Sequence, residues 1–319
     1  MHAFVSDRYG SPDVMRLEEV PIPEATGERV LVRVLATSVN AYDWHRRRGK
    51  PYLARPTAVW TRPRDTILGL DVAGVVEAVG PDVTGLAVGD EVFGSRLGAF
   101  AEYVSGKNFI HKPGTLAFAE AAAIPTAGMT ALQAVRDHAG VEAGHHVLVI
   151  GAGGGVGTFA VQIAKALGAE VTATTGAGSL ELVRSLGADR AVDYRAEDIT
   201  RGPLRYDAIV DVGGRPSLRR LSRVLASDGR LVMVAPGPGN WIGPVVRIVG
   251  AGIRSRLSSQ RMRGFMAGVN RDDLATLRGF VEAGAVRPVI DRTFPFEQIP
   301  DAVRYVESGK ARGKVVVTR

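Results

Sequence analysis

Residues 145–175 read HHVLVIGAGGGVGTFAVQIAKALGAEVTATT, and this stretch decides the fold. The apolar run His145–Ile150 predicts a strand, residues 158–168 predict a helix, and Glu170–Thr175 predict a second strand. The glycines between the first strand and the helix allow backbone amides and the helix N-terminus to approach a pyrophosphate closely. We therefore predict a dinucleotide-binding strand–helix–strand unit. A glycine-rich turn that only connects two elements is the alternative.

The rest of the chain divides into a β-rich part and a part in which strands and helices alternate. Turn signals such as Gly80-Pro81-Asp82 separate the early strands, which we expect at residues 29–38, 71–79 and 100–104. Beyond about residue 120 we expect helices at 119–123, 130–138, 179–186 and 217–225, and strands at 190–194, 206–212 and 230–235. Such alternation predicts a parallel sheet covered on both faces. The fold class is therefore α/β, with a doubly wound Rossmann sheet and a β-rich domain.

The composition is that of a globular protein with more than one domain. The 319 residues suffice for two cores, and 45% of them are apolar and 23% charged. No apolar run reaches the roughly 18 residues of a membrane span. The first residues, MHAFVSDR, lead directly into a predicted strand without a secretory signal pattern, so we expect a cytoplasmic protein.

Cysteine is absent and arginine is abundant. The lack of cysteine excludes disulfides, thiolate nucleophiles and cysteine-based zinc sites. The formal net charge of +7 comes partly from arginine clusters at residues 46–48, 219–220 and 254–263. These clusters lack interleaved stacking aromatics, which favours solvated faces or phosphate contacts over nucleic-acid binding.

Short motifs along nearly the whole chain share the pattern of one family. They are Ser38-Val39-Asn40-x-x-Asp43, Gly69-Leu70-Asp71-Val72-Ala73-Gly74, Val79-Gly80-x-x-Val83, Gly89-Asp90-x-Val92, Pro125-Thr126-Ala127-Gly128-Met129-Thr130-Ala131, the glycine turn, Leu186-Gly187-Ala188-Asp189 and Arg312-Gly313-Lys314-Val315-Val316. Together they resemble the medium-chain dehydrogenase/reductases, and within them the zinc-independent quinone oxidoreductases related to zeta-crystallin. The resemblance implies a GroES-like catalytic domain at residues 1–124 and 267–319, and a Rossmann NADP-binding domain at residues 125–266.

The sequence departs from the zinc-dependent alcohol dehydrogenases of this family at the metal site. Their metal-binding cysteine falls at Asn40, and their Gly-His-Glu falls at Gly69-Leu70-Asp71, where leucine cannot bind a metal. His45 alone remains nearby, and one imidazole does not hold zinc. We therefore expect no metal.

The end of the second strand of the nucleotide unit favours NADP(H) over NAD. A carboxylate that binds the ribose hydroxyls is expected there in NAD enzymes, but the chain reads Thr174-Thr175-Gly176. Alanine, glycine and serine occupy the place where relatives carry a basic residue. The donors for a 2′-phosphate would then be Thr174, Thr175, Ser179 and Tyr194, helped by Arg184; strand threonines and a capping tyrosine are the alternative. The full expected cofactor set is Thr130, Gly151, Gly154, Gly155, Val156, Gly157, Thr174, Thr175, Ser179, Tyr194, Val212, Ala235 and Gly237.

The expected chemistry is hydride transfer to a quinone or an α,β-unsaturated carbonyl compound. Without a Lewis acid, a conjugated acceptor is easier to reduce than a simple ketone. The negative charge that hydride addition creates spreads onto a distant oxygen, where hydrogen bonds can stabilise it. Asn40 and Tyr42 are the candidate donors to that oxygen, and Asp43 is expected to brace their loop. By family position, Thr130 lies near the nicotinamide. Asn40 tying down a turn and Tyr42 as a half-buried strand-end aromatic are the alternatives.

Four aromatic residues are candidates for a pocket that stacks a planar substrate: Trp44, Tyr52, Trp60 and Trp241. Loop anchors are the alternative. Residues 261–269 resemble the family's last Rossmann strand, which pairs across a two-fold axis, so we expect a homodimer. Two other functions stay open, a zinc-free NAD(P)-dependent alcohol or ketone dehydrogenase and a cofactor-binding sensor or RNA-binding protein with little turnover.

Overall fold

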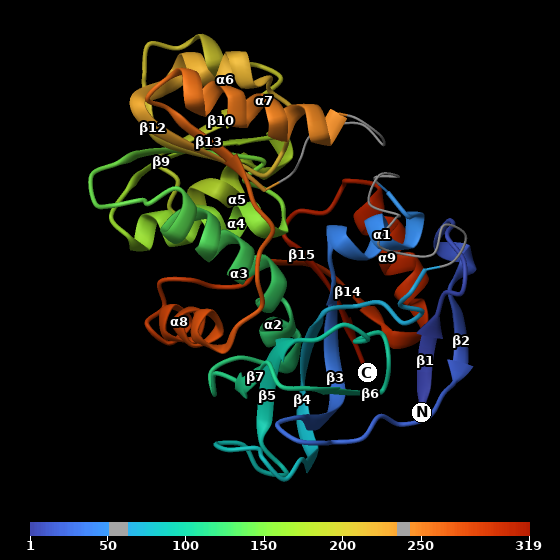
Figure 1. The fold of residues 1–319 in the computed structure, drawn as a ribbon. Helices are drawn as coiled ribbons and strands as arrows, with labels where there is room; N and C mark the ends of the chain where they lie inside the picture. Colours follow the sequence, from blue (N-terminus) through green and yellow to red (C-terminus); the bar gives the residue numbers. More distant parts are fainter. Residues whose placement is uncertain (51–62, 235–242) are drawn as a thin grey trace. The chain divides into compact units, whose positions relative to one another are not determined.

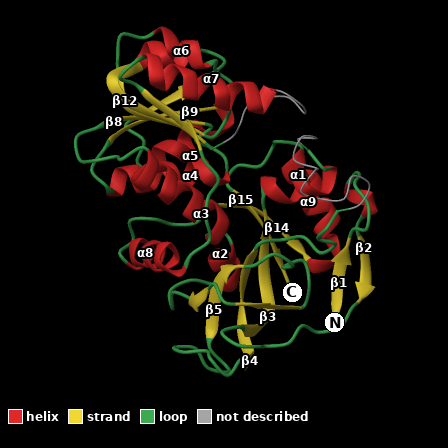
Figure 2. Ribbon diagram, in the orientation of Figure 1, coloured by secondary structure: helices red, strands yellow, loops and turns green. Residues whose placement is uncertain are grey.

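The computed structural model describes residues 1–50, 63–234 and 243–319, which form two compact units. Unit 1 comprises Met1–Ala127, Val269–Glu282 and Pro288–Arg319, and unit 2 comprises Gly128–Gly268 and Ala283–Arg287. Figure 2 shows the strands gathered in two separate groups, one in each unit. The predicted fold class, a β-rich part and a doubly wound parallel sheet, is confirmed.

Unit 2 is built on a six-stranded parallel sheet with the strand order β10-β9-β8-β11-β12-β13. Its strands are β8 (His146–Ile150), β9 (Glu170–Thr175), β10 (Arg190–Asp193), β11 (Tyr206–Asp211), β12 (Leu225–Met233) and β13 (Arg261–Gly264). Helices α4 (Gly155–Ala166) and α5 (Leu180–Ser185) lie on one face, and α6 (Leu218–Val224) and α7 (Gly243–Leu257) on the other (Figure 1). The apolar residues of β8 are buried because both faces are covered.

Unit 1 contains a seven-stranded sheet with the order β14-β15-β3-β4-β5-β7, in which β6 also pairs with β3, and a two-stranded sheet of β1 and β2. The strands are β1 (His2–Val5), β2 (Arg16–Glu19), β3 (Val30–Val39), β4 (Asp71–Val79), β5 (Glu91–Ser95), β6 (Tyr103–Gly106), β7 (Phe109–His111), β14 (Ile290–Pro295) and β15 (Lys314–Thr318). Its helices are α1 (Ala41–Arg48), α2 (Phe118–Ala122), α8 (Arg271–Glu282) and α9 (Ile299–Glu307). Helix α3 (Pro125–Leu132) continues into a π-helical turn at Gln133–His138.

The pairing of β3 with its two neighbours brings distant parts of the chain together. Strand β4 pairs antiparallel with β3 so that Asp71 lies opposite Ser38. Strand β15 pairs antiparallel with the other edge of β3 and places Val316 opposite Ser38 and Val315 opposite Val39. The register therefore puts Lys314, the first residue of β15, beside the residue that follows β3, which is Asn40.

The structure corrects the prediction for the segment that follows β3. The segment after β3, expected as a turn or strand end, is helix α1. Asp43 accepts a hydrogen bond of 2.8 Å from the backbone N–H of Asn40, and Gly49 ends the helix with φ +61°. An acidic residue three positions after the N-cap and a glycine after the last turn are helix boundary signals that our prediction missed.

The strand expected at residues 261–269 begins at Arg261 as predicted, but it is shorter, because β13 ends at Gly264. Beyond it the side chain of Met266 is 92% exposed. The amide of Gln133 then replaces a strand partner: its Nε2 donates to the Gly268 carbonyl at 2.8 Å, and the Gly268 N–H donates to its Oε1 at 3.0 Å. The strand predicted at 100–104 begins later than expected, at Tyr103.

Candidate cofactor site and polar cluster

The turn between β8 and α4 has a geometry that only glycine permits at two positions. Gly151 has φ +80°, and a Cβ there would lie 2.9 Å from the backbone nitrogen of Gly213. A Cβ at Gly157 would lie 2.3 Å from the carbonyl oxygen of Gly151, so the helix packs directly on the turn. Helix α4 has no side-chain cap at Gly154, and the first amides of a helix have no partner within it. The turn thus offers the free amides of Gly155, Val156 and Gly157 to an anion.

The predicted polar donors after β9 lie next to this turn. A Cβ at Gly153 would meet Thr175 Oγ1 at 2.5 Å and the Ser179 side chain at 2.9 Å. Thr174 instead contributes its carbonyl oxygen, which accepts hydrogen bonds of 3.0 Å from the backbone of Gly151 and of Ala152, while its side chain is buried. Val212 lies at the same edge of the sheet, where its N–H donates to the Ile150 carbonyl at 2.9 Å.

Two arginines that the sequence analysis did not single out lie next to the Tyr194 ring. The guanidinium carbons of Arg195 and Arg215 lie 5.5 Å and 5.2 Å from the centre of the Tyr194 ring, within the range of cation–π attraction. Arg184, which was expected to help here, forms an ion pair with Glu181. Arg215 follows β11 and Tyr194 follows β10, so the two arginines supply positive charge at the carboxyl edge of the sheet.

A buried ion pair stabilises the loop that follows β11. Asp211 is fully buried, accepts a hydrogen bond of 2.8 Å from Gly214 N, and pairs with Arg247 of α7. Arg247 also donates to the Gly214 carbonyl. Burial raises the pKa of Asp211, and the Arg247 guanidinium opposes this shift. This pair fixes the loop between Val212 and Arg215, and it escaped prediction because its members are 36 residues apart.

Unit 1 contains a buried polar cluster around Asp71, which we call the Asp71 cluster. Asp71 Oδ2 accepts from Ser38 Oγ at 2.5 Å, from Asn40 Nδ2 at 2.9 Å and from Lys314 Nζ at 3.2 Å. Asp71 Oδ1 accepts from the N–H of Thr126 at 2.8 Å and from its Oγ1 at 2.5 Å. Lys314 Nζ donates to Asn40 Oδ1 at 2.5 Å. The carboxylate is therefore saturated with donors, as a buried charge requires.

Asp43 lies next to this cluster and braces two backbone segments, as expected. Its carboxylate accepts from Asn40 N at 2.8 Å and from Gly69 N at 3.1 Å. Burial raises the pKa of Asp43 to about 7, and the charge of Asp71 adds to the shift, while the two backbone donors and Lys314 oppose it.

This pKa predicts a pH dependence of stability. Between pH 4 and 7 the unfolded chain ionises Asp43 while the folded chain keeps its proton, so the free energy of unfolding falls as the pH rises. The contribution is at most roughly 4 kcal/mol, at about 1.4 kcal/mol per pKa unit. We expect the difference in unfolding free energy between wild type and Asp43→Asn, measured with urea, to decrease over this range and to level off above pH 7. A difference that does not change with pH would contradict the raised pKa.

The remaining predicted site residues are partly exposed, buried, or outside the described residues. Tyr42 is 37% exposed on α1, its hydroxyl has no hydrogen-bond partner among the described residues, and partial burial raises its pKa. Trp44 packs partly against the core around Phe4 and Phe296. Thr130 is a buried residue of α3. Five predicted residues lie outside the described residues: Tyr52, Trp60, Ala235, Gly237 and Trp241.

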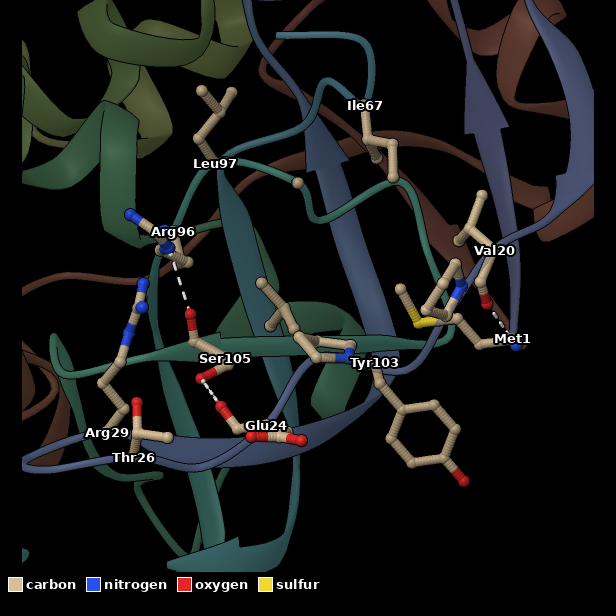
Figure 3. A pocket seen from close by; sticks show the side chains of 14 residues that line it. Met1, Val20, Glu24, Thr26, Arg29, Ile67, Arg96, Leu97, Tyr103 and Ser105 are labelled. Carbon is tan, nitrogen blue, oxygen red and sulfur yellow. Dashed lines mark hydrogen bonds between the residues drawn. The ribbon is translucent and has the colours of Figure 1, made fainter. Parts of the chain in front are cut away.

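None of the predicted site residues lines the pocket shown in Figure 3. This pocket of about 650 Å³ lies in unit 1, with Arg29 and Arg96 at one end and Val20 and Ile67 at the other. Arg96 Nε donates to the Ser105 carbonyl at 3.1 Å, so the segments that form the wall are bonded to one another.

The described residues, that is, the chain without 51–62 and 235–242, contain no group of three or more histidine, aspartate or glutamate side chains arranged to hold a metal ion. They also contain no helix long and apolar enough to span a membrane.

Comparison with known proteins identifies the family. Residues 26–163 match the alcohol dehydrogenase GroES-like domain, and residues 186–317 match a zinc-binding dehydrogenase domain. The chloroplastic NADPH-dependent alkenal/one oxidoreductase of Arabidopsis thaliana is 37% identical over 99% of this chain and 79% of its own length. The structure of the quinone oxidoreductase from Coxiella burnetii superposes with a TM-score of 0.86 at 29% identity, over 100% of this chain and 99% of that one. A structure described as an NAD-dependent alcohol dehydrogenase has the same TM-score at 32% identity and covers 100% of both chains. The chain therefore belongs to the medium-chain dehydrogenase/reductase superfamily, among the quinone and alkenal oxidoreductases.

Proposed function

We propose that this protein is an NADPH-dependent reductase that transfers a hydride to quinones or α,β-unsaturated carbonyl compounds without a metal ion. The Asp71 cluster carries the proposal. Asn40 and Asp71 stand where the zinc-dependent members of the family carry a cysteine and a glutamate, and here the two side chains bond to each other and to the ammonium of Lys314. An amide, a saturated carboxylate and an ammonium are not a zinc ligand set, because zinc binds thiolate, imidazole and free carboxylate groups.

The residues of unit 2 fit a nicotinamide dinucleotide. The turn around Gly151–Gly157 leaves no room for a Cβ at Gly157 and presents free helix amides, as a pyrophosphate requires. Bound NADPH would supply the hydride from its nicotinamide ring. We assign the 2′-phosphate to the donors Thr175, Ser179 and Tyr194, with positive charge from Arg195 and Arg215. These arginines provide the cationic partner that the sequence immediately after β9 lacks.

Replacing Arg215 by glutamine is expected to weaken NADPH binding about tenfold and to leave NADH binding within about twofold. One exposed charge-assisted hydrogen bond to a phosphate contributes on the order of 1.4 kcal/mol, and NADH lacks that phosphate. Nucleotide fluorescence titration at low salt measures both dissociation constants. The matched control is Arg184→Gln, since Arg184 is already paired with Glu181. Equal losses for both nucleotides would remove Arg215 from the 2′-phosphate site.

Hydrogen bonds, rather than a Lewis acid, would stabilise the charge that forms on the acceptor. In a quinone or enone, hydride addition to carbon moves negative charge to an oxygen, and donors placed at that oxygen lower the barrier. We assign this role to the amide of Asn40 and to the phenol of Tyr42, whose hydroxyl has no hydrogen-bond partner in the part of the chain that the structure describes. Thr130 is assigned to the nicotinamide and ribose, and Trp44 to the substrate pocket.

A zinc-free alcohol or ketone dehydrogenase is the second candidate, favoured by the similarity to a structure described as an NAD-dependent alcohol dehydrogenase. A panel of quinones, enones and simple ketones, with NADPH oxidation followed by absorbance, separates the two. Oxidation with quinones or enones alone supports the first function, and oxidation with simple ketones supports the second. No oxidation with any substrate would favour a sensor or an RNA-binding protein.

We further propose a cytoplasmic homodimer in which β13 pairs with its copy. Strand β13 is the edge of the sheet in unit 2, and an exposed edge is an open template for another strand. Size-exclusion chromatography with light scattering tests the dimer, and a monomer at micromolar concentration would contradict it.

A further inference from the structure

Lys314 is a buried ammonium whose partners come from two other parts of the chain. Its side chain is 3% exposed, and that of Asp71 is fully buried. Its Nζ lies 2.5 Å from Asn40 Oδ1 and 3.2 Å from Asp71 Oδ2. Neither contact reflects local sequence, because 274 and 243 residues separate the partners. The antiparallel register of β15 on β3 brings them together.

These contacts fix the orientation of the Asn40 amide without ambiguity. An ammonium only donates and an ionised carboxylate only accepts, so the oxygen of Asn40 must face Lys314 and its nitrogen must face Asp71. One hydrogen of Nδ2 is used in the bond of 2.9 Å to Asp71 Oδ2. Within residues 1–50, 63–234 and 243–319 the second has only the Ser38 carbonyl nearby, at 3.5 Å, which is too long for a good hydrogen bond. One amide hydrogen is therefore left for another acceptor, in a direction that Lys314 and Asp71 determine together.

We propose that Lys314 is a positioning residue for the reductase reaction. It holds Asn40 Oδ1 so that the remaining amide hydrogen points to the acceptor oxygen, and its charge polarises the amide and strengthens that donor. The inference rests on the role of Asn40 under the proposed function. No bond to Lys314 forms or breaks during turnover, since it acts only through Asn40.

The neighbours of Asp71 explain why the charge of Lys314 is tolerated at this depth. Ser38 and Thr126 hold the carboxylate by three hydrogen bonds of 2.5 to 2.8 Å that do not depend on Lys314. Neutral donors therefore hold the Asp71 carboxylate in place, and its negative charge compensates the positive charge of Lys314. Removing Lys314 would leave Asp71 in place, so the Asn40 amide would keep its bond to Asp71 through Nδ2 but lose the partner of its Oδ1, and it would be held at one point instead of two.

The test compares two buried lysines of unit 1. Lys314→Met should lower kcat at least tenfold, with the NADPH dissociation constant unchanged within twofold. Lys112→Met is the control, because the Lys112 side chain is 5% exposed and bonds to the carbonyls of Pro113 and Leu116, away from Asn40. It should change kcat by less than twofold. A similar loss of kcat in both variants would show a merely structural effect and overturn the proposal.

A double-mutant cycle with Asn40→Ala tests whether Lys314 acts through Asn40. If it does, Lys314→Met lowers kcat in the wild-type background but causes no further loss in Asn40→Ala. Equal factors in both backgrounds would overturn the inference. Normal turnover of Asn40→Ala alone would instead show that the assigned role of Asn40 in the proposed function is wrong. Should Lys314→Met not fold, Lys314→Gln keeps a donor for Asn40 Oδ1 without the charge, and an unchanged kcat there would overturn the polarising role.

Discussion

Replacing Asp71 with asparagine is expected to lower the free energy of unfolding by about 3–5 kcal/mol, the range found when one partner of a buried ion pair is removed. The side chain is fully buried and receives five hydrogen bonds from Ser38, Asn40, Lys314 and Thr126. Asparagine has the same shape but places an amide group against donors, and it leaves the ammonium of Lys314 without a counter-charge. Urea denaturation at constant pH measures the loss.

A double variant separates the charge effect from the hydrogen bonds. Asp71→Asn combined with Lys314→Met removes both charges, so it should recover part of the stability that Asp71→Asn loses. Asp90→Asn is a control of the same chemistry, because Asp90 also accepts a backbone bond but lies near the surface; it should have a much smaller effect. If the losses of the two single variants simply add in the double variant, the two charges do not interact.

The second large effect is expected in the glycine turn of unit 2. Gly154 has φ −90° and ψ 176°, which alanine adopts freely, and among the described residues a Cβ there would meet only the Gly151 carbonyl oxygen, at 3.6 Å. Gly154→Ala should therefore fold with wild-type stability. Its methyl group would nevertheless occupy the place where a pyrophosphate meets the helix amides. Losing two charge-assisted hydrogen bonds of about 1.5 kcal/mol each corresponds to a weakening of NADPH binding of at least about 100-fold.

Gly157→Ala supplies the contrast. Its Cβ would lie 2.3 Å from the carbonyl oxygen of Gly151, which is backbone and cannot move aside easily, so both stability and NADPH binding should fall. Gly114→Ala is the neutral control, since no described residue lies within 4 Å of a Cβ there. Thermal unfolding and calorimetric titration with NADPH measure the two properties separately. If Gly154→Ala binds NADPH as tightly as wild type, the turn is not the pyrophosphate site.

Local signals account for the features that the sequence predicted. The glycine turn, β8 and β9 follow from an apolar run, a glycine cluster and a second β-branched run within about thirty residues. The strand Asp71–Val79 occurs with the predicted bounds because apolar, β-branched residues fill it between turn signals. These predictions needed only neighbours along the chain.

The features that depend on strand register could not be predicted. Lys314 meets Asn40 because β15 pairs with β3, and no local pattern in Arg312–Val316 indicates which strand it joins. Arg215 reaches Tyr194 for a similar reason, since each follows a different strand of one sheet. Helix α1, in contrast, has local signals. Its boundary residues, Asp43 and Gly49, are present in the sequence, but the prediction used Asn40, Tyr42 and Asp43 only as single motif residues and did not predict a helix.

The position of β15, which follows unit 2 in the chain, has a consequence for biosynthesis. Unit 1 needs Lys314–Thr318 beside β3, whereas most of unit 2 is one continuous segment, Gly128–Gly268. On the ribosome, domains fold as their residues emerge. Unit 2 can therefore form its sheet while translation continues, but the first hundred residues wait until Lys314–Thr318 are made. Until then the carboxylate of Asp71 lacks the Lys314 ammonium, so a chain that stops before residue 314 contains a complete sheet in unit 2 and an unfinished sheet in unit 1.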